Sequence, residues 1–143
     1  MIIINAFLKV PIPEFIKKYD ISPRDAIETL GEARFRDMEH EVIKELGKTS
    51  GAIIATGGGV VTRKENIPYL RQNGRIIYLH CIPSDLAVTP DRPLSSNRSV
   101  IKAMYEVRHP LYLEAADAVV EVSHKTSPEL SAMGVLNTFS ELI

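Results

Sequence analysis

Apolar residues along this chain fall into two patterns, short continuous runs and stripes with the spacing of an α-helix. Short runs bounded by glycine, proline or charged residues are typical of buried strands. They predict strands over 2–7, 52–55, 75–81 and 118–122. The stripes predict helices over 13–19, 22–30, 32–46, 62–70, 100–107, 112–116 and 128–143, with Pro110 interrupting the pattern between 107 and 112.

Two of these helices carry local start or stop signals. Ser22 followed by Pro23 is a favourable N-terminus, and Gly31 ends the helix that they open. Thr62 with Glu65 three residues later predicts a capping box at the start of the helix toward residue 70.

The order of elements predicts an α/β fold. Strands 52–55 and 75–81, joined by one helix, form a βαβ pattern, in which the two strands run parallel. A length of 143 residues without a repeat or linker predicts a single domain over 1–143. Residues 88–98 contain two prolines and no apolar periodicity, which predicts a lid-like polar loop over a site.

Composition narrows the classes of partner. A net charge of −1 and a pI near 6.4 argue against nucleic acid and anionic membranes as partners, and leave a small acidic ligand open. Cys81 is the only cysteine, so no internal disulfide forms and a reducing, cytoplasmic location fits. The four histidines have no metal-ligand spacing, so no metal site is predicted, and no nucleophilic triad is indicated.

Gly57, Gly58 and Gly59 follow the apolar strand 52–55 directly. Residues without a Cβ atom let a ligand approach the backbone amides and can adopt positive φ. Ligands of open α/β sheets gather at the carboxyl ends of parallel strands, which is where this run lies. The run therefore predicts a binding loop, with a tight strand-to-helix turn that holds no ligand as the alternative.

Three arginines are candidates for binding an anion. Arg36 and Glu39 share one helix face, so the carboxylate can orient the guanidinium, although an ordinary surface ion pair has the same spacing. Arg92, in the polar loop, would reach a ligand when the loop closes, or is a solvated loop residue. Arg108 precedes Pro110 at an expected corner between helices, or offsets a helix dipole.

Five motifs between about Phe15 and Val122 together resemble those of the shikimate kinase family. The motifs occur in the family's order, and the Phe-Arg-x-x-Glu and triple-glycine pair favours shikimate kinases over the related gluconate kinases. They are Gly31-Glu-Ala-Arg-Phe-Arg36-Asp-Met-Glu39, Ile54-Ala-Thr-Gly-Gly-Gly-Val-Val61, Arg92-Pro-Leu94, Arg108-His-Pro-Leu-Tyr112 and Ala116-Asp117.

The resemblance implies a three-layer P-loop kinase fold of the nucleoside-monophosphate-kinase type, a parallel sheet flanked by helices. Its members transfer the γ-phosphoryl group of ATP to shikimate with Mg²⁺, a step of aromatic amino acid biosynthesis through chorismate. Carried over by motif, Arg36 and Arg108 would bind the carboxylate of shikimate and Glu39 would orient Arg36. The amides of Gly57, Gly58 and Gly59 would meet the ring hydroxyls. Arg92 would be the catalytic lid arginine that neutralises the phosphates.

The nucleotide half of the family pattern does not match. No G-x-x-x-x-G-K-[ST] loop occurs, and Gly47-Lys-Thr49 follows a predicted helix and lacks the upstream glycine. Alignment back from Gly31 places the family's Asp-x-Asp carboxylates at Val10 and Ile12. Residues 1–11 are therefore a divergent arm, in which the N-terminal part of the fold is truncated or replaced.

We therefore expect a shikimate kinase-like chain that retains much of the acceptor site, binds shikimate weakly at most, lacks the part that binds ATP and Mg²⁺, and is inactive alone. The alternative is a non-catalytic ligand-binding or regulatory module derived from the kinase fold. Such a module could self-associate through the sheet edge that the lost strand leaves uncovered.

Overall fold

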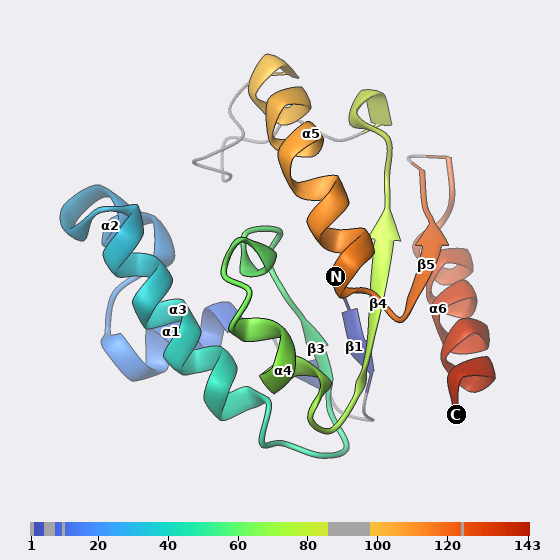
Figure 1. Cartoon of the computed structure of the whole chain (residues 1–143), viewed down its shortest axis with the longest axis horizontal. Coiled ribbons are helices and arrows are strands. Elements are labelled where there is room, and N and C mark those ends of the chain that lie inside the picture. The colour runs from blue at the N-terminus through green and yellow to red at the C-terminus, as the bar shows by residue number, and fades with distance from the viewer. Residues whose placement is uncertain (1, 5–7, 10, 86–97, 124) are drawn as a thin grey trace. The chain divides into compact units, whose positions relative to one another are not determined.

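The computed structural model describes residues 2–4, 8–9, 11–85, 98–123 and 125–143. The chain forms two compact units, unit 1 over Met1–Ile76 and unit 2 over Ile77–Ile143, each with its own helices and strands (Figure 1). The single domain over 1–143 stays a prediction.

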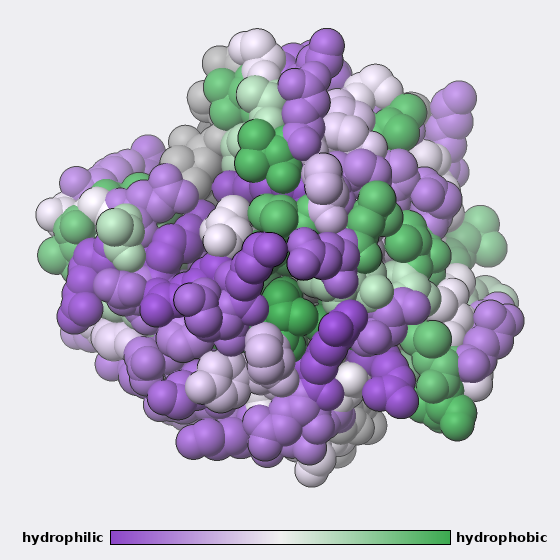
Figure 2. All heavy atoms as spheres, in the orientation of Figure 1, coloured by the Kyte–Doolittle hydropathy of each residue, from purple (hydrophilic) through white to green (hydrophobic). Residues whose placement is uncertain are grey.

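Three helices open unit 1, α1 (Pro11–Tyr19), α2 (Pro23–Leu30) and α3 (Glu32–Leu46). The Oγ of Ser22 accepts a hydrogen bond from the amide of Asp25 at 3.0 Å, so Ser22 caps α2 as predicted. Gly31, at φ 86°, separates α2 from α3, and this conformation favours glycine. The face of α2 and α3 seen in Figure 2 is mainly hydrophilic, as expected for solvated helices.

The apolar stripe of α3 forms part of the core of unit 1. Phe35, Met38, Val42 and Leu46 are all buried, which confirms the predicted apolar stripe. The ring of Phe15, from α1, packs on Phe35 with centroids 5.3 Å apart. Burying each such side chain stabilises the fold by about 1.5–3 kcal/mol, and this packing fixes the rotation of α3 about its axis. The polar residues between the stripe positions are thereby held in fixed directions.

The strands of unit 1 differ from the prediction at the N-terminus. Within the predicted strand 2–7, β1 (Ile2–Ile4) is a strand and residues 5–7 lie outside the described residues; β2 (Leu8–Lys9) is a further strand that was not predicted. β1 pairs antiparallel with β3 (Ile53–Ala55), and β2 pairs parallel with it. The divergent arm thus covers both sides of β3, which itself has no free edge.

The segment after the glycine run also differs. The predicted capping box is wrong, because the Oγ1 of Thr62 donates to the carbonyl of Gly59 at 2.7 Å. That bond belongs to a 3₁₀ turn, η1 (Val60–Thr62), and the following helix α4 (Asn66–Arg71) starts four residues later, without a side-chain cap. Thr62 therefore closes the glycine turn instead of opening a helix.

Unit 2 contains most of β4 (Arg75–His80), the turn η2 (Pro83–Asp85), α5 (Arg98–Ala115), β5 (Ala118–Glu121) and α6 (Pro128–Leu142). β4 and β5 are parallel, and α6 lies along β5 (Figure 1). The predicted polar loop lies outside the described residues, apart from Arg98, which begins α5. None of the helices that the structure describes is long and apolar enough to cross a membrane.

The predicted break at Pro110 is wrong, because α5 continues through it. Proline removes one helical hydrogen bond and crowds the preceding turn. Aromatic packing on both sides of Pro110 offsets that loss: Tyr78 of β4 contacts His109, with centroids 5.7 Å apart, and stacks on Tyr112 at 4.8 Å. Burial in this cluster raises the pKa of Tyr78 to about 12.

Candidate functional site

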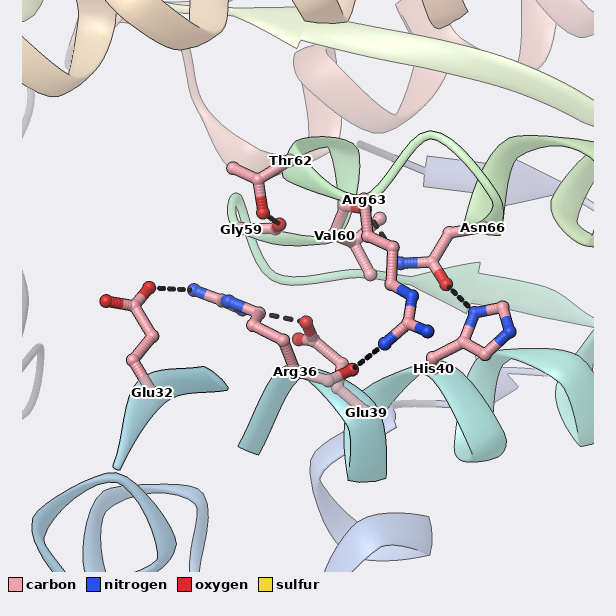
Figure 3. Close-up of polar contacts among 9 residues, drawn as sticks. All are labelled: Glu32, Arg36, Glu39, His40, Gly59, Val60, Thr62, Arg63 and Asn66. Atoms are coloured by element: carbon pink, nitrogen blue, oxygen red, sulfur yellow. Dashed lines mark hydrogen bonds and ion pairs between the residues drawn. The ribbon is translucent and has the colours of Figure 1, made fainter. Parts of the chain in front are cut away.

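The guanidinium of Arg36 is held between two carboxylates of its own helix (Figure 3). Its Nη1 donates to Glu39 Oε2 at 2.7 Å, and its Nη2 donates to Glu32 Oε1 at 3.1 Å. The side chains of Arg36 and Glu39 are 15% and 13% exposed, whereas that of Glu32 is 53% exposed. The Arg36–Glu39 pair is therefore partly shielded from solvent, which distinguishes it from a freely solvated ion pair, the alternative that the spacing alone left open.

The glycine run approaches this guanidinium closely. A Cβ atom on Gly59 would clash with both terminal nitrogens of Arg36 and lie 2.6 Å from Cζ. Gly59 has φ −82°, so at this position glycine supplies space and not a left-handed backbone. Gly57 and Gly58 are exposed, and a Cβ on Gly57 would meet no atom within 4 Å. The structure thus brings the predicted residues Arg36, Glu39 and Gly59 together, beside two open glycines.

Two further side chains of α3 hold the segment that follows the glycines. The Nδ1 of His40 lies 2.6 Å from the Oδ1 of Asn66, and the Nδ2 of Asn66 donates to the carbonyl of Val60 at 2.8 Å. Asp37 accepts from Arg63 Nη1 at 2.6 Å. Successive turns of α3 therefore anchor the backbone from Gly59 to Asn66 (Figure 3).

Sequence reasoning missed Glu32, His40 and Asn66. The signal for the first two was helical spacing, since Glu32 and His40 lie one turn before and after Arg36 on the same face. Asn66 had no local signal, because its role depends on burial that only the tertiary structure creates.

The other two candidate arginines lie outside the described part of unit 1. Arg92 lies outside the described residues, so its role stays a prediction. Arg108 is not at a corner between helices; it is a half-buried residue within the continuous helix α5 of unit 2. In the portion of the chain that is described, no carboxylate forms an ion pair with it. Its convergence with Arg36 stays a prediction.

Comparison with known proteins identifies the class. In a search of solved structures, a shikimate kinase from Acinetobacter baumannii in complex with shikimate matches 96% of this chain and 80% of its own, with a TM-score of 0.84 and 26% identity. The shikimate kinase of Bacteroides thetaiotaomicron matches with a TM-score of 0.80 at 19% identity, which supports the fold alone. The fold is the α/β P-loop kinase fold, as predicted.

Sequence relatives agree with this class. The shikimate kinase family model matches residues 13–139, and the chain belongs to the shikimate kinase family. A shikimate kinase of Ralstonia nicotianae is 35% identical over 138 residues, covering 87% of this chain and 73% of its own length. One of Burkholderia lata is 44% identical over 98 residues, covering 64% and 53%. The chain thus spans about half to three quarters of the length of these relatives.

The described segment 47–49, which partly resembles a phosphate-binding loop in sequence, does not fit a phosphate. The amide of Gly47 bonds to the carbonyl of Ile43, that of Lys48 to Glu45, and that of Thr49 to Leu46. All three amides complete the end of α3, so none is available for a phosphate. Ile12, at a family carboxylate position, is an exposed apolar residue on α1. Among the described residues, no group of three potential metal ligands occurs.

Proposed function

We propose that this chain is the acceptor-binding part of a shikimate kinase and binds shikimate at the face formed by α3 and the glycine run. Arg36 binds the carboxylate of shikimate, Glu39 orients Arg36, and the amides of Gly57, Gly58 and Gly59 meet the ring hydroxyls. The observation that carries the proposal is the contact between the oriented guanidinium of Arg36 and the backbone of Gly59.

The chemistry of the acceptor fits this arrangement. A planar guanidinium binds a carboxylate through two parallel N–H···O bonds, which are stronger than bonds between neutral groups. Exposed glycines beside it let a small hydroxylated ring lie against the backbone without a side chain intervening. Membership of the family and the likeness to an enzyme crystallised with shikimate support the same ligand.

Two further arginines complete the proposed site. Arg108 supplies a second cation for the carboxylate, and Arg92 is the catalytic arginine that neutralises charge on the transferred phosphoryl group when a nucleotide is supplied. A single cysteine and a small acidic metabolite are consistent with a cytoplasmic protein.

By this proposal the chain alone transfers no phosphoryl group, because its sequence contains no G-x-x-x-x-G-K-[ST] loop. Phosphoryl transfer depends on amides, a lysine and a metal that cradle the phosphates. Self-association through an uncovered sheet edge would not use β3, which is paired on both sides. Sedimentation velocity at increasing concentration tests whether the chain self-associates.

Titration calorimetry with shikimate tests the ligand. We expect Arg36→Ala to weaken binding by at least about 100-fold, and Arg36→Lys by about tenfold, because lysine keeps the charge and loses the fork. Arg24→Ala, which removes an exposed arginine paired with Glu28, is the matched control and should leave the affinity unchanged. No binding by the wild-type chain, or equal affinity in Arg36→Ala, would contradict the proposal.

A coupled assay with ATP, Mg²⁺ and shikimate tests the second half of the proposal. The chain alone is expected to release no ADP above the background of the assay. Turnover that depends on shikimate would contradict this expectation and show that other residues of the chain hold the nucleotide.

A further inference from the structure

Asn66 is a buried polar residue of unit 1. The residue is 1% exposed and is the first of α4, yet both ends of its side-chain amide have partners. A buried amide that lost either hydrogen bond would be destabilised by the full penalty of leaving water. Such a fully satisfied group specifies one arrangement of the backbone segments that it joins.

The orientation of this amide follows from its two partners. Its Nδ2 faces the carbonyl oxygen of Val60, because a flipped amide would place two acceptor oxygens against each other. The Oδ1 therefore faces His40 and requires a donor there, so the proton of His40 lies on Nδ1. The imidazole of His40 also makes an edge contact with the ring of Tyr69, with centroids 5.6 Å apart.

The hydrogen bonds of Asn66 also affect the position of the glycine run. Val60 directly follows Gly59, so the chain His40, Asn66, Val60 connects α3 to the residue that touches the guanidinium of Arg36. His40 is one helical turn after Arg36, which places both ends of this connection on one rigid helix. The guanidinium of Arg36 and the backbone next to Gly59 are therefore both held by α3, and this fixes the distance between them (Figure 3).

We propose that His40 and Asn66 are positioning residues, which hold the glycine run against Arg36 at the spacing that a small hydroxylated carboxylate requires. The inference rests on the proposed function for its ligand, although neither residue touches that ligand. The two residues act on affinity through the backbone of Gly59 and Val60. Removing the donor of His40 leaves Asn66 Oδ1 unpaired, and the segment shifts until water reaches it.

Three variants of α3 separate positioning from general stability. His40→Leu removes the donor at similar volume, and His40→Gln keeps an N–H donor. Val42→Ala is the control, since Val42 is buried on the same helix and lines a shallow cavity with Glu14 and Lys17 of α1. Urea unfolding gives the stability of each variant, so that effects on binding can be compared at similar loss of stability.

Amide NMR of the ligand-free protein is the first readout. The resonances of Gly58 and Gly59 should shift or broaden in His40→Leu, return toward the wild-type positions in His40→Gln and stay in place in Val42→Ala. Calorimetry with shikimate is the second, and there His40→Leu should bind about tenfold more weakly and His40→Gln within about threefold of wild type.

The two readouts keep this inference distinct from the proposed function. Equal affinities and equal glycine resonances in His40→Leu and Val42→Ala would overturn the positioning role, even if the wild-type chain binds shikimate. If the wild-type chain does not bind shikimate, the proposed function fails, and the glycine resonances alone decide whether His40 and Asn66 position the loop.

Discussion

Two closely packed glycines of unit 1 differ in the atoms that lie against them. Gly59 faces a guanidinium, and Gly47 faces the backbone carbonyl of Tyr69. Each is too crowded for a Cβ atom, but only the first lies beside a charged group that a ligand can use. Crowding at a glycine therefore indicates close packing, and the chemistry of the neighbouring atoms decides whether that packing belongs to a site.

The same contrast separates the proposed acceptor site from the segment that only partly resembles a phosphate-binding loop. The proposed acceptor site has a guanidinium oriented by Glu39 and anchored glycines, whereas the amides of Gly47, Lys48 and Thr49 are all bonded to α3. An amide within a helix end has no free hydrogen for a phosphate. Substitutions on each side should therefore have different effects.

Gly59→Ala should have the largest effect on binding. Its methyl group would displace the guanidinium of Arg36, and a displacement near 1 Å weakens such an aligned contact by about 100-fold. Stability should change little, because the guanidinium is the end of a flexible side chain. Calorimetry with shikimate and urea unfolding of the same sample measure both; unchanged affinity would show that the Gly59 contact is not part of the site.

Gly47→Ala should instead lower the stability of the protein. Its methyl group would meet the backbone of Tyr69, which cannot rotate away, and the overpacking should destabilise unit 1 by about 1–3 kcal/mol. The folded protein should keep its affinity for shikimate. Urea unfolding checks the first expectation, and a loss of affinity larger than that of Gly59→Ala would reverse the comparison.

Glu32→Gln should strengthen binding about two- to fivefold, because the exposed carboxylate of Glu32 competes with the ligand for Nη2 of Arg36. Glu28→Gln is the matched control, since Glu28 also pairs with an arginine one turn away on an exposed helix face. Calorimetry at low and moderate salt measures both variants. Weaker binding in Glu32→Gln would mean that Glu32 orients Arg36 as Glu39 does.

Lys48→Met should have the smallest effect. A lysine of a phosphate-binding loop is essential for nucleotide affinity, whereas Lys48 directly follows α3 and its amide is bonded to Glu45. The affinity for shikimate should therefore change by no more than about twofold, and neither the wild type nor the variant should bind ATP. Fluorescence titration with an ATP analogue measures nucleotide binding. A large loss of nucleotide affinity would show that this segment does contact phosphate.

Much of the fold was predictable because its signals are local. Ser22, Gly31 and the apolar stripe of α3 act within one or two turns, and the structure confirms the helices that they define. The predictions at Thr62 and Pro110 were wrong because tertiary contacts decide them. Thr62 bonds back to Gly59, and packing on Tyr78 carries α5 through its proline.

The residues of the candidate site also divide into those that the sequence could predict and those that it could not. Arg36, Glu39 and the glycines were found from motif and spacing, since they lie on two short segments. Asn66 was not predicted, because its role depends on burial and on the two hydrogen-bond partners of its side-chain amide, which the sequence does not show. The roles of Arg92 and Arg108 stay predictions from the resemblance.

The direction of β1 has a practical consequence for measuring any of these affinities. β1 runs antiparallel to β3, so that Ile2 pairs with Ala55, two residues before Gly57. A purification tag fused ahead of Ile2 would emerge at the glycine end of the strand and could compete with small anions there. A tag fused after α6 begins in unit 2, away in sequence from the strand that carries the glycines, and is the better choice.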